Sequence, residues 1–146
     1  MICHCVRTTV LLLSVAVALG CTDPSPSVSI ERGDQTLEPI AQFRVDVART
    51  AAERAAGLRG AEPLCDDCGL WIEFPLTTEA CIVNDGVSFA LDVVYVTEAG
   101  SVVAVERDVP AADATARCHS DVRSILEVSA GAASVVAIGD RVYFSP

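Results

Sequence analysis

The sequence predicts a mainly β fold, a small sandwich or barrel of about seven to nine short strands with one or two short helices. Short runs rich in Val, Ile and aromatic residues recur roughly every ten residues, as they do in all-β domains. Turn signals such as Asn84-Asp85-Gly86 and Glu98-Ala99-Gly100 separate them. Together these observations predict a single β-rich domain over residues 41–146.

Ahead of this domain, the first twenty residues have the order of a secretory signal peptide. Arg7 precedes the apolar run 10–19, which ends in small residues. Cys21 directly follows a Leu-Gly pair, which resembles the position of the acylated cysteine in bacterial lipoproteins. We therefore expect residues 1–20 to be removed and Cys21 to carry a lipid anchor; the alternative is an ordinary signal peptide that happens to contain a cysteine. Residues 21–40, rich in Pro, Ser, Thr and charge, are expected to form a flexible tether.

The folded part is expected to begin with a half-buried strand, because Phe43, Val45 and Val47 alternate with polar residues. Thr50-Ala51-Ala52-Glu53 has the form of a helix capping box and predicts a short helix over 50–59. Residues 132–137 are expected to add one helical turn. The remaining strands are predicted at 70–74, 80–83, 91–97, 102–106, 124–128 and 141–144.

The charge balance excludes one class of partner. The net charge is −10, the chain contains no Lys, and its Arg residues do not cluster. Nucleic acids need a cationic patch, so we expect no binding to DNA or RNA. The expected contact with a membrane is therefore the lipid on Cys21, at a cell-envelope location facing the periplasm or exterior.

Cysteine parity points to the same oxidising compartment. Three of the seven cysteines lie in the signal peptide or at the anchor, and an even four remain, which favours two disulfides. A Cys81–Cys118 bond would close a loop of nearly forty residues, worth about 3–4 kcal/mol, and is expected as the stabilising disulfide. Cys65–Cys68 is expected as the second, local one. The competing arrangement joins Cys65 or Cys68 to Cys118.

The same cysteines could carry chemistry instead. Cys65 and Cys68 have the spacing of thiol-redox sites, but the two aspartates between them oppose a thiolate, so a structural disulfide is preferred. A zinc site would need the four cysteines and His119 to converge. His119 is otherwise expected to lie in a solvated loop, and no Ser lies in a nucleophile-elbow pattern. We therefore assign no catalytic residue, metal or cofactor.

Two acidic residues lie within apolar runs, Asp92 in Leu91–Val94 and Glu127 in Ile125–Val128. A carboxylate there is unfavourable unless it is hydrogen-bonded or paired. The structural interpretation, which we favour, is that they bind backbone amides or an Arg such as Arg123 or Arg141. The functional interpretation is that they face a common cleft. The candidate lining of such a cleft is Trp71, Asn84, Asp92 and Glu127.

The order of segments resembles a prokaryotic family called domain of unknown function 192, over about residues 42–144. The segments that carry the resemblance are Phe43-Arg44-Val45-Asp46-Val47-Ala48, Thr50, Glu53-Arg54, Gly57-Leu58-Arg59-Gly60, Gly69-Leu70-Trp71-Ile72-Glu73-Phe74, Leu91-Asp92-Val93-Val94-Tyr95-Val96, Ser124-Ile125-Leu126-Glu127-Val128, Ala130-Gly131 and Gly139-Asp140-Arg141-Val142. The resemblance implies a small β domain packed with a short helix, and it implies no activity.

From these features we expect a lipid-anchored envelope domain that binds a small molecule, a saccharide or another protein, and that is not an enzyme. One alternative is a glycan-acting enzyme that uses Asp92 and Glu127. Another is a purely structural envelope lipoprotein, which would lack a pocket able to hold a ligand.

Overall fold

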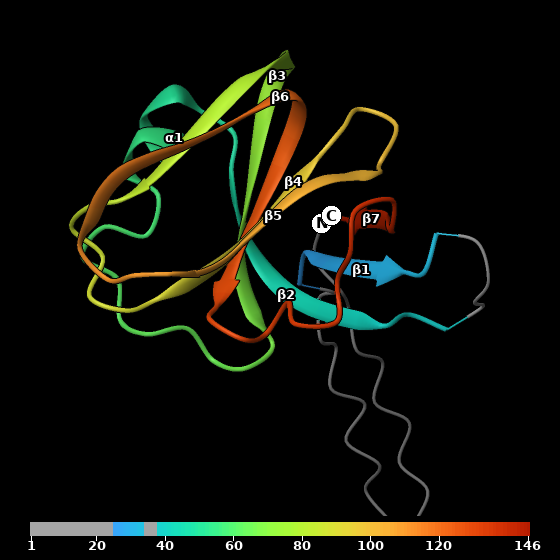
Figure 1. Cartoon of the computed structure of the whole chain (residues 1–146), viewed down its shortest axis with the longest axis horizontal. Helices are drawn as coiled ribbons and strands as arrows, with labels where there is room; N and C mark the ends of the chain where they lie inside the picture. Colours follow the sequence, from blue (N-terminus) through green and yellow to red (C-terminus); the bar gives the residue numbers. More distant parts are fainter. Residues whose placement is uncertain (1–24, 34–37) are drawn as a thin grey trace, which may run out of the picture.

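A computed structural model describes residues 25–33 and 38–146. These residues form one seven-stranded sheet in the order β5-β4-β6-β3-β2-β1-β7, with a short helix beside it (Figure 1). The elements are β1 Ser27–Glu31, β2 Ala41–Ala48, α1 Ala51–Ala56, β3 Cys68–Asn84, β4 Leu91–Val96, β5 Val102–Val109, β6 Asp113–Ser129 and β7 Arg141–Ser145.

The mainly β prediction is confirmed, and the strands belong to one sheet and not to a sandwich. The sheet is not closed into a barrel, but an isolated bridge between Ser101, directly before β5, and Arg141 of β7 links its two edges. The two strands predicted at 70–74 and 80–83 are parts of the single 17-residue strand β3. Its pairing with β6 shifts register between Glu73 and Thr78, around Pro75. Proline cannot donate a ladder hydrogen bond, so it interrupts the sequence pattern while the bent strand continues. The expected helical turn at residues 132–137 does not form: residues 132–135 form turns, and residues 136 and 137 are irregular.

The expected tether is wrong in one part, because β1 lies inside residues 21–40. Val28 and Ile30 are completely buried and alternate with polar residues. β1 pairs antiparallel with both β2 and β7, which adds two strands to one edge of the sheet. Composition alone suggested a linker, because five residues give too short an alternation to stand out from the Pro- and Ser-rich sequence before it.

The helix follows the sequence prediction at its start. The Thr50 hydroxyl accepts from the Glu53 amide, and the Glu53 carboxylate accepts from the Thr50 amide, which completes the capping box. Gly57 ends the helix with φ near 51°, a conformation that favours glycine. The helix connects β2 to β3, and these two strands pair in parallel, as a helical crossover allows.

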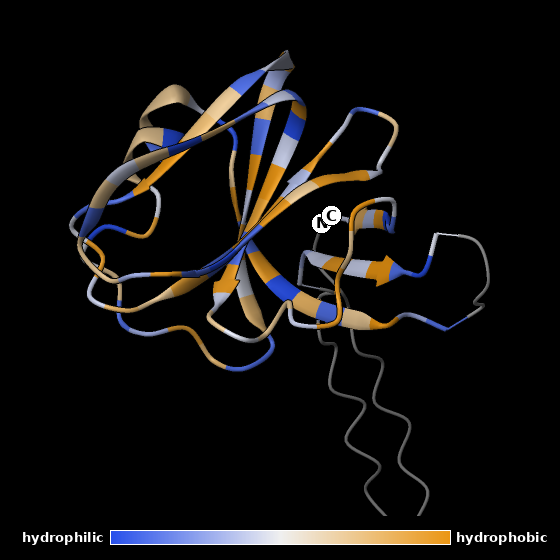
Figure 2. Ribbon diagram, viewed as in Figure 1, coloured by the Kyte–Doolittle hydropathy of each residue, from blue (hydrophilic) through white to orange (hydrophobic). Residues whose placement is uncertain are grey.

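Hydrophobic residues recur along the strands (Figure 2), and they build a core on each face of the sheet. The first core contains Trp71, Val94 and Leu126, together with β1 and β7 residues. The second core contains Ile72 and Tyr95, together with Leu58 beyond α1. Strand β4 is buried along its whole length, because it contributes to both cores. Polar groups in the middle of the sheet therefore enter one core or the other.

Within the described residues, no helix is long and apolar enough to cross a membrane. The expected signal peptide and the lipidated Cys21 lie outside those residues.

Candidate binding cavity

A cavity of about 200 Å³ lies between the helical segment and the sheet. α1 and the turn after it form one wall, the end of β3 forms another, and one residue of β6 contributes a carboxyl group. The lining residues are Arg54, Ala55, Ala56, Gly57, Leu58, Arg59, Ile72, Cys81, Ile82, Val83, Asn84, Val87 and Glu127.

Glu127 reaches this cavity because of strand alternation. Its neighbours Leu126 and Val128 point into the first core, so Glu127 points to the opposite face, where it lies opposite Leu70 and Val93. The residue is only 4% exposed. Burial raises the pKa of its carboxyl to about 7, and in the described part of the chain no donor or cation offsets the shift.

Asn84 is the second polar residue of the cavity, and it also fixes the loops around it. Its side-chain amide donates to the carbonyl of Phe89 at 3.0 Å and to the carbonyl of Pro110 at 2.8 Å. The residue is 1% exposed. Both amide protons are thus used in holding backbone, and the side-chain oxygen remains as the acceptor.

Two arginines of the helical segment complete the polar lining. The Arg54 guanidinium donates to the backbone carbonyls of Arg49 and Glu73 and lies over the Phe74 ring. The Arg59 guanidinium donates to the Ala55 carbonyl at 2.6 Å. Each guanidinium has further N–H groups, so both arginines are held in place and can still donate to a ligand.

Asp92 does not join this cavity, which corrects the expectation of a common cleft. It lies opposite Val128 on β6 and therefore enters the first core, on the other face of the sheet from Glu127. Its carboxylate accepts from the backbone amides of Asp108, Gly131 and Ala133, each at 3.0 Å. The favoured structural interpretation therefore describes Asp92, with backbone amides and not Arg123 or Arg141 as its partners.

Trp71 is also separated from the cavity. Its ring belongs to the first core and stacks on Phe144 with centroids 5.7 Å apart. Its indole N–H donates to the Glu73 carboxylate at 3.2 Å. Of the four residues proposed from the sequence, the structure brings only Asn84 and Glu127 together.

The four cysteines of the domain form the two expected disulfides. Cys81 and Cys118 lie directly opposite each other on β3 and β6, with Cα atoms 4.0 Å apart. Cys65 and Cys68 form the local bond, with Cα atoms 5.0 Å apart. The cysteines therefore pair at two separate places, and the zinc alternative, which needs all four to converge with His119, does not describe this arrangement.

His119 lies on strand β6 and not in the solvated loop that was expected. Its Nε2 is 2.8 Å from a carboxylate oxygen of Glu106, and its ring packs edge-on against Tyr95 with centroids 4.4 Å apart. The Tyr95 hydroxyl donates to the Arg117 carbonyl at 2.9 Å. Burial raises the pKa of that hydroxyl well above its usual range. Contacts across the sheet therefore hold His119 and Tyr95 in place.

Arg54 and Arg59 were not among the residues proposed from the sequence. Both lie in the segment 50–59 that was predicted to be helical, and a charged residue on a surface helix is most often simply solvated. What places them at the cavity is the crossover from β2 to β3, which sets this segment against the face that carries Glu127.

The solved structures similar to this chain share its fold. A protein of unknown function from Novosphingobium aromaticivorans has a TM-score of 0.74 and 23% identity, over 80% of this chain and 83% of that one. A protein from Sinorhizobium meliloti described as a candidate transcription regulator has a TM-score of 0.75 and 18% identity, over 84% of this chain and 98% of that one. At these identities the likeness concerns the fold alone.

No curated protein gives a significant match to this chain. A family model does: that of DUF192, described as an uncharacterised ACR, matches residues 32–144. This range covers nearly the whole domain and agrees with the resemblance noted from the sequence. The chain belongs to the DUF192 family.

Proposed function

We propose that this chain is a lipid-anchored protein of the cell envelope, and that its cavity binds one small polar molecule with hydroxyl groups, such as a single saccharide unit. The observation that carries the proposal is the buried carboxyl of Glu127, which lines a cavity of about 200 Å³. Such a cavity is smaller than the roughly 300–1,000 Å³ of sites for drug-sized ligands, so it suits one ring or a similar molecule.

The polar groups of the cavity are complementary to hydroxyl groups. A carboxyl whose pKa is about 7 is present in both protonation states near neutral pH, so Glu127 can donate a hydrogen bond or accept one. Asn84 offers an acceptor, and Arg54 and Arg59 offer donors. A few convergent polar groups in an otherwise apolar lining are typical of a site for a small ligand.

Binding fits this cavity better than glycan hydrolysis. Glycoside hydrolases use two carboxyl groups that flank the scissile bond. Among the described residues that line the cavity, Glu127 is the one acidic residue. Asp92, the expected partner, lies on the other face of the sheet and is occupied by three backbone amides.

The envelope location is supported by the sequence before the domain and by the cysteines within it. A signal-like segment ends directly before Cys21. Two disulfides in a domain of this size are typical of an oxidising compartment. The acidic net charge opposes binding to nucleic acid, so the proposal extends to no such partner.

A saccharide and metabolite screen by NMR chemical-shift perturbation tests the binding proposal on the full-length chain in detergent. The expected hits perturb the amides of α1 and of the end of β3. Glu127→Leu should weaken binding at least tenfold, because it removes the carboxyl group from the cavity while filling similar space. Trp71→Phe, on the other face, is the matched control and should bind unchanged. Equal binding by Glu127→Leu would refute the proposal.

The anchor is tested separately by detergent partitioning. Cys21→Ala should move the protein from the membrane fraction to the soluble fraction or leave it unprocessed, because acyl chains would supply the attachment that an acidic domain lacks. Cys3→Ala, inside the expected signal peptide, should partition as the unsubstituted chain does. If Cys21→Ala partitioned into the membrane as a processed protein, the lipoprotein assignment would be wrong.

A further inference from the structure

We propose that the Cys65–Cys68 disulfide is a thiol–disulfide exchange site that takes two electrons from a dithiol protein. This proposal is independent of the ligand cavity, which lies elsewhere on the molecule. It rests on three features of the surroundings of the bond: a cation on the sulfurs, an accessible sulfur, and an adjoining cavity.

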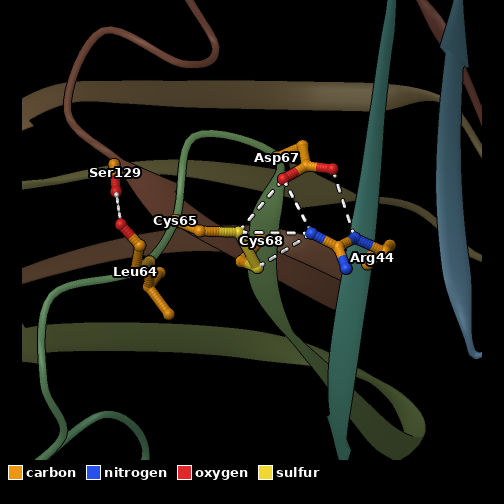
Figure 3. The surroundings of a disulfide bond; sticks show 6 residues. All are labelled: Arg44, Leu64, Cys65, Asp67, Cys68 and Ser129. Carbon is orange, nitrogen blue, oxygen red and sulfur yellow. Dashed lines mark hydrogen bonds and ion pairs between the residues drawn. A yellow bond between two sulfur atoms is a disulfide. The ribbon is translucent and has the colours of Figure 1, made fainter.

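The cation is Arg44, which the parallel pairing of β2 and β3 places opposite Cys68. One nitrogen of its guanidinium lies 3.6 Å from the Cys65 sulfur and 3.9 Å from the Cys68 sulfur (Figure 3). A cation at this position stabilises a thiolate, which is the leaving group when a disulfide is attacked.

Asp67 is part of the same arrangement. From the sequence, the two aspartates between the cysteines were expected to oppose a thiolate. In the structure both carboxylate oxygens of Asp67 accept from Arg44, at 3.0 and 3.2 Å. One of them also lies 3.1 Å from the Cys65 sulfur (Figure 3), where it can accept a hydrogen bond from the Cys65 thiol after reduction. The negative charge of Asp67 is therefore paired with Arg44.

Access to the bond is open from one side. Cys65 is exposed and Cys68 is half-buried, so an incoming thiolate reaches Cys65 more easily. A cavity of about 390 Å³ is lined by both cysteines, by the apolar residues Pro26, Val45, Pro63 and Leu64, and by the polar residues Ser25, Arg44 and Asp46. A hollow with both polar and apolar lining beside an exposed disulfide provides a place for the residues that flank the cysteine of a partner protein.

The exchange balances without any further reactant. A thiolate of the partner attacks the Cys65 sulfur, the Cys65–Cys68 bond breaks, and Cys68 leaves as a thiolate beside Arg44. The second thiol of the partner loses its proton to solvent and attacks the mixed disulfide, and Cys65 leaves as a thiolate that takes up a proton. The partner is oxidised to a disulfide, and Cys65 and Cys68 are reduced to a thiol and a thiolate; the thiolate of Cys68 becomes a thiol when it takes up a proton from solvent, which replaces the one that the attacking thiol of the partner had lost.

The second disulfide of the molecule is a natural control. Cys81 and Cys118 are also exposed, but in the described part of the chain no cation contacts either sulfur. If exposure alone governed exchange, the two disulfides would react at similar rates. If the Arg44 contact matters, Cys65–Cys68 reacts faster.

The test uses the full-length chain in detergent with reduced thioredoxin as the dithiol protein. Alkylation at timed intervals and mass spectrometry follow each disulfide separately. We expect Cys65–Cys68 to be reduced at least tenfold faster than Cys81–Cys118. A thioredoxin variant that lacks its second cysteine should be trapped as a mixed disulfide on Cys65.

The role of Arg44 is tested with Arg44→Ala and Arg44→Lys. For an exposed contact we expect Arg44→Ala to slow reduction about fivefold and to shift the equilibrium in a glutathione buffer about fivefold toward the disulfide. Arg44→Lys should retain most of the effect, and circular dichroism should show the same fold in all three proteins. Equal rates for the two disulfides, or an unchanged equilibrium in Arg44→Ala, would overturn the proposal.

Discussion

Asp92 and Glu127 lie on adjacent strands of one sheet and are both almost completely buried, but the surroundings of their carboxyl groups differ. The Asp92 carboxylate accepts three backbone hydrogen bonds in the first core. The Glu127 carboxyl lines a cavity beside the second core, and burial raises its pKa to about 7. Their exposures are 1% and 4%, so burial does not distinguish them.

The difference shows what makes a buried carboxyl a candidate for function. Backbone amides around Asp92 compensate the loss of hydration, and they hold the segment after β6 against the hairpin of β4 and β5. Glu127 lacks this compensation in the described part of the chain, so its ionisation is unfavourable and a ligand can supply the missing partner. Asp92 therefore maintains the fold, and the Glu127 carboxyl is available to bind a ligand.

The largest effect is expected for Asp92→Asn. The variant replaces an acceptor of three amide protons by a group that carries protons of its own, so buried donors lose their partner. We expect a loss of about 4 kcal/mol in the free energy of unfolding, measured by urea denaturation. Asp46→Asn, on the exposed side of β2, should change stability by less than about 0.5 kcal/mol. If both variants were equally stable, the three hydrogen bonds would not be important for the fold.

Glu127→Gln is expected to make the folded protein more stable than the wild type, and this effect develops only as the pH rises above the acidic range. The pKa of Glu127 is higher in the folded state than the ordinary 4.5, so the unfolded chain loses this proton first and the wild type loses stability as pH rises from about 4.5 to 7. The loss is about 3 kcal/mol and is absent in the Gln variant. The stability difference between the two proteins should therefore grow by about that amount between pH 4 and pH 8. A constant difference across this range would contradict the raised pKa.

Asn84 is a neutral polar residue of the same cavity, so its substitution shows the effect of losing a buried polar group without any change of ionisation. Asn84→Ala leaves the carbonyls of Phe89 and Pro110 without their donor. We expect a loss of about 2 kcal/mol that is equal at pH 5 and pH 8, measured by thermal and urea unfolding. A pH-dependent loss would mean that Asn84 and Glu127 are coupled.

The smallest effect is expected for Trp71→Phe. The ring can still pack on Phe144, and the main loss is one hydrogen bond to Glu73, so we expect about 1 kcal/mol. The pKa of Glu127, followed by NMR, should stay unchanged because Trp71 lies on the other face. A shift of that pKa would show that the two faces are coupled through β3.

The sequence predicted most of the elements, since hydrophobic alternation and the capping box at Thr50 are local signals. It did not predict the architecture, because the continuity of β3 past Pro75 and the pairing of β1 with β2 and β7 depend on contacts between distant segments. It also missed that β1 lies within the expected tether.

The candidate site was predicted only in part for a related reason. Apolar flanks identified Asp92 and Glu127 as unusual, but the flanks of the two residues are alike and do not show which face of the sheet each carboxyl enters. The pairing of Asp92 with Val128 places the two carboxyls on opposite faces. Arg54 and Arg59 of the cavity, and Arg44 at the Cys65–Cys68 bond, carry no local signal. Strand register and the β2–β3 crossover bring them to their sites.

The contrast between Asp92 and Glu127 depends most directly on the ionisation of Glu127. A titration followed by NMR, with the side-chain carboxyl carbons of Glu labelled with ¹³C and Glu127→Gln used for assignment, measures it in the folded protein. We expect a midpoint near pH 7, well above the 4.5 of an ordinary Glu. A midpoint at or below 4.5 would mean that this carboxyl is compensated as Asp92 is, and the contrast between the two residues would be wrong.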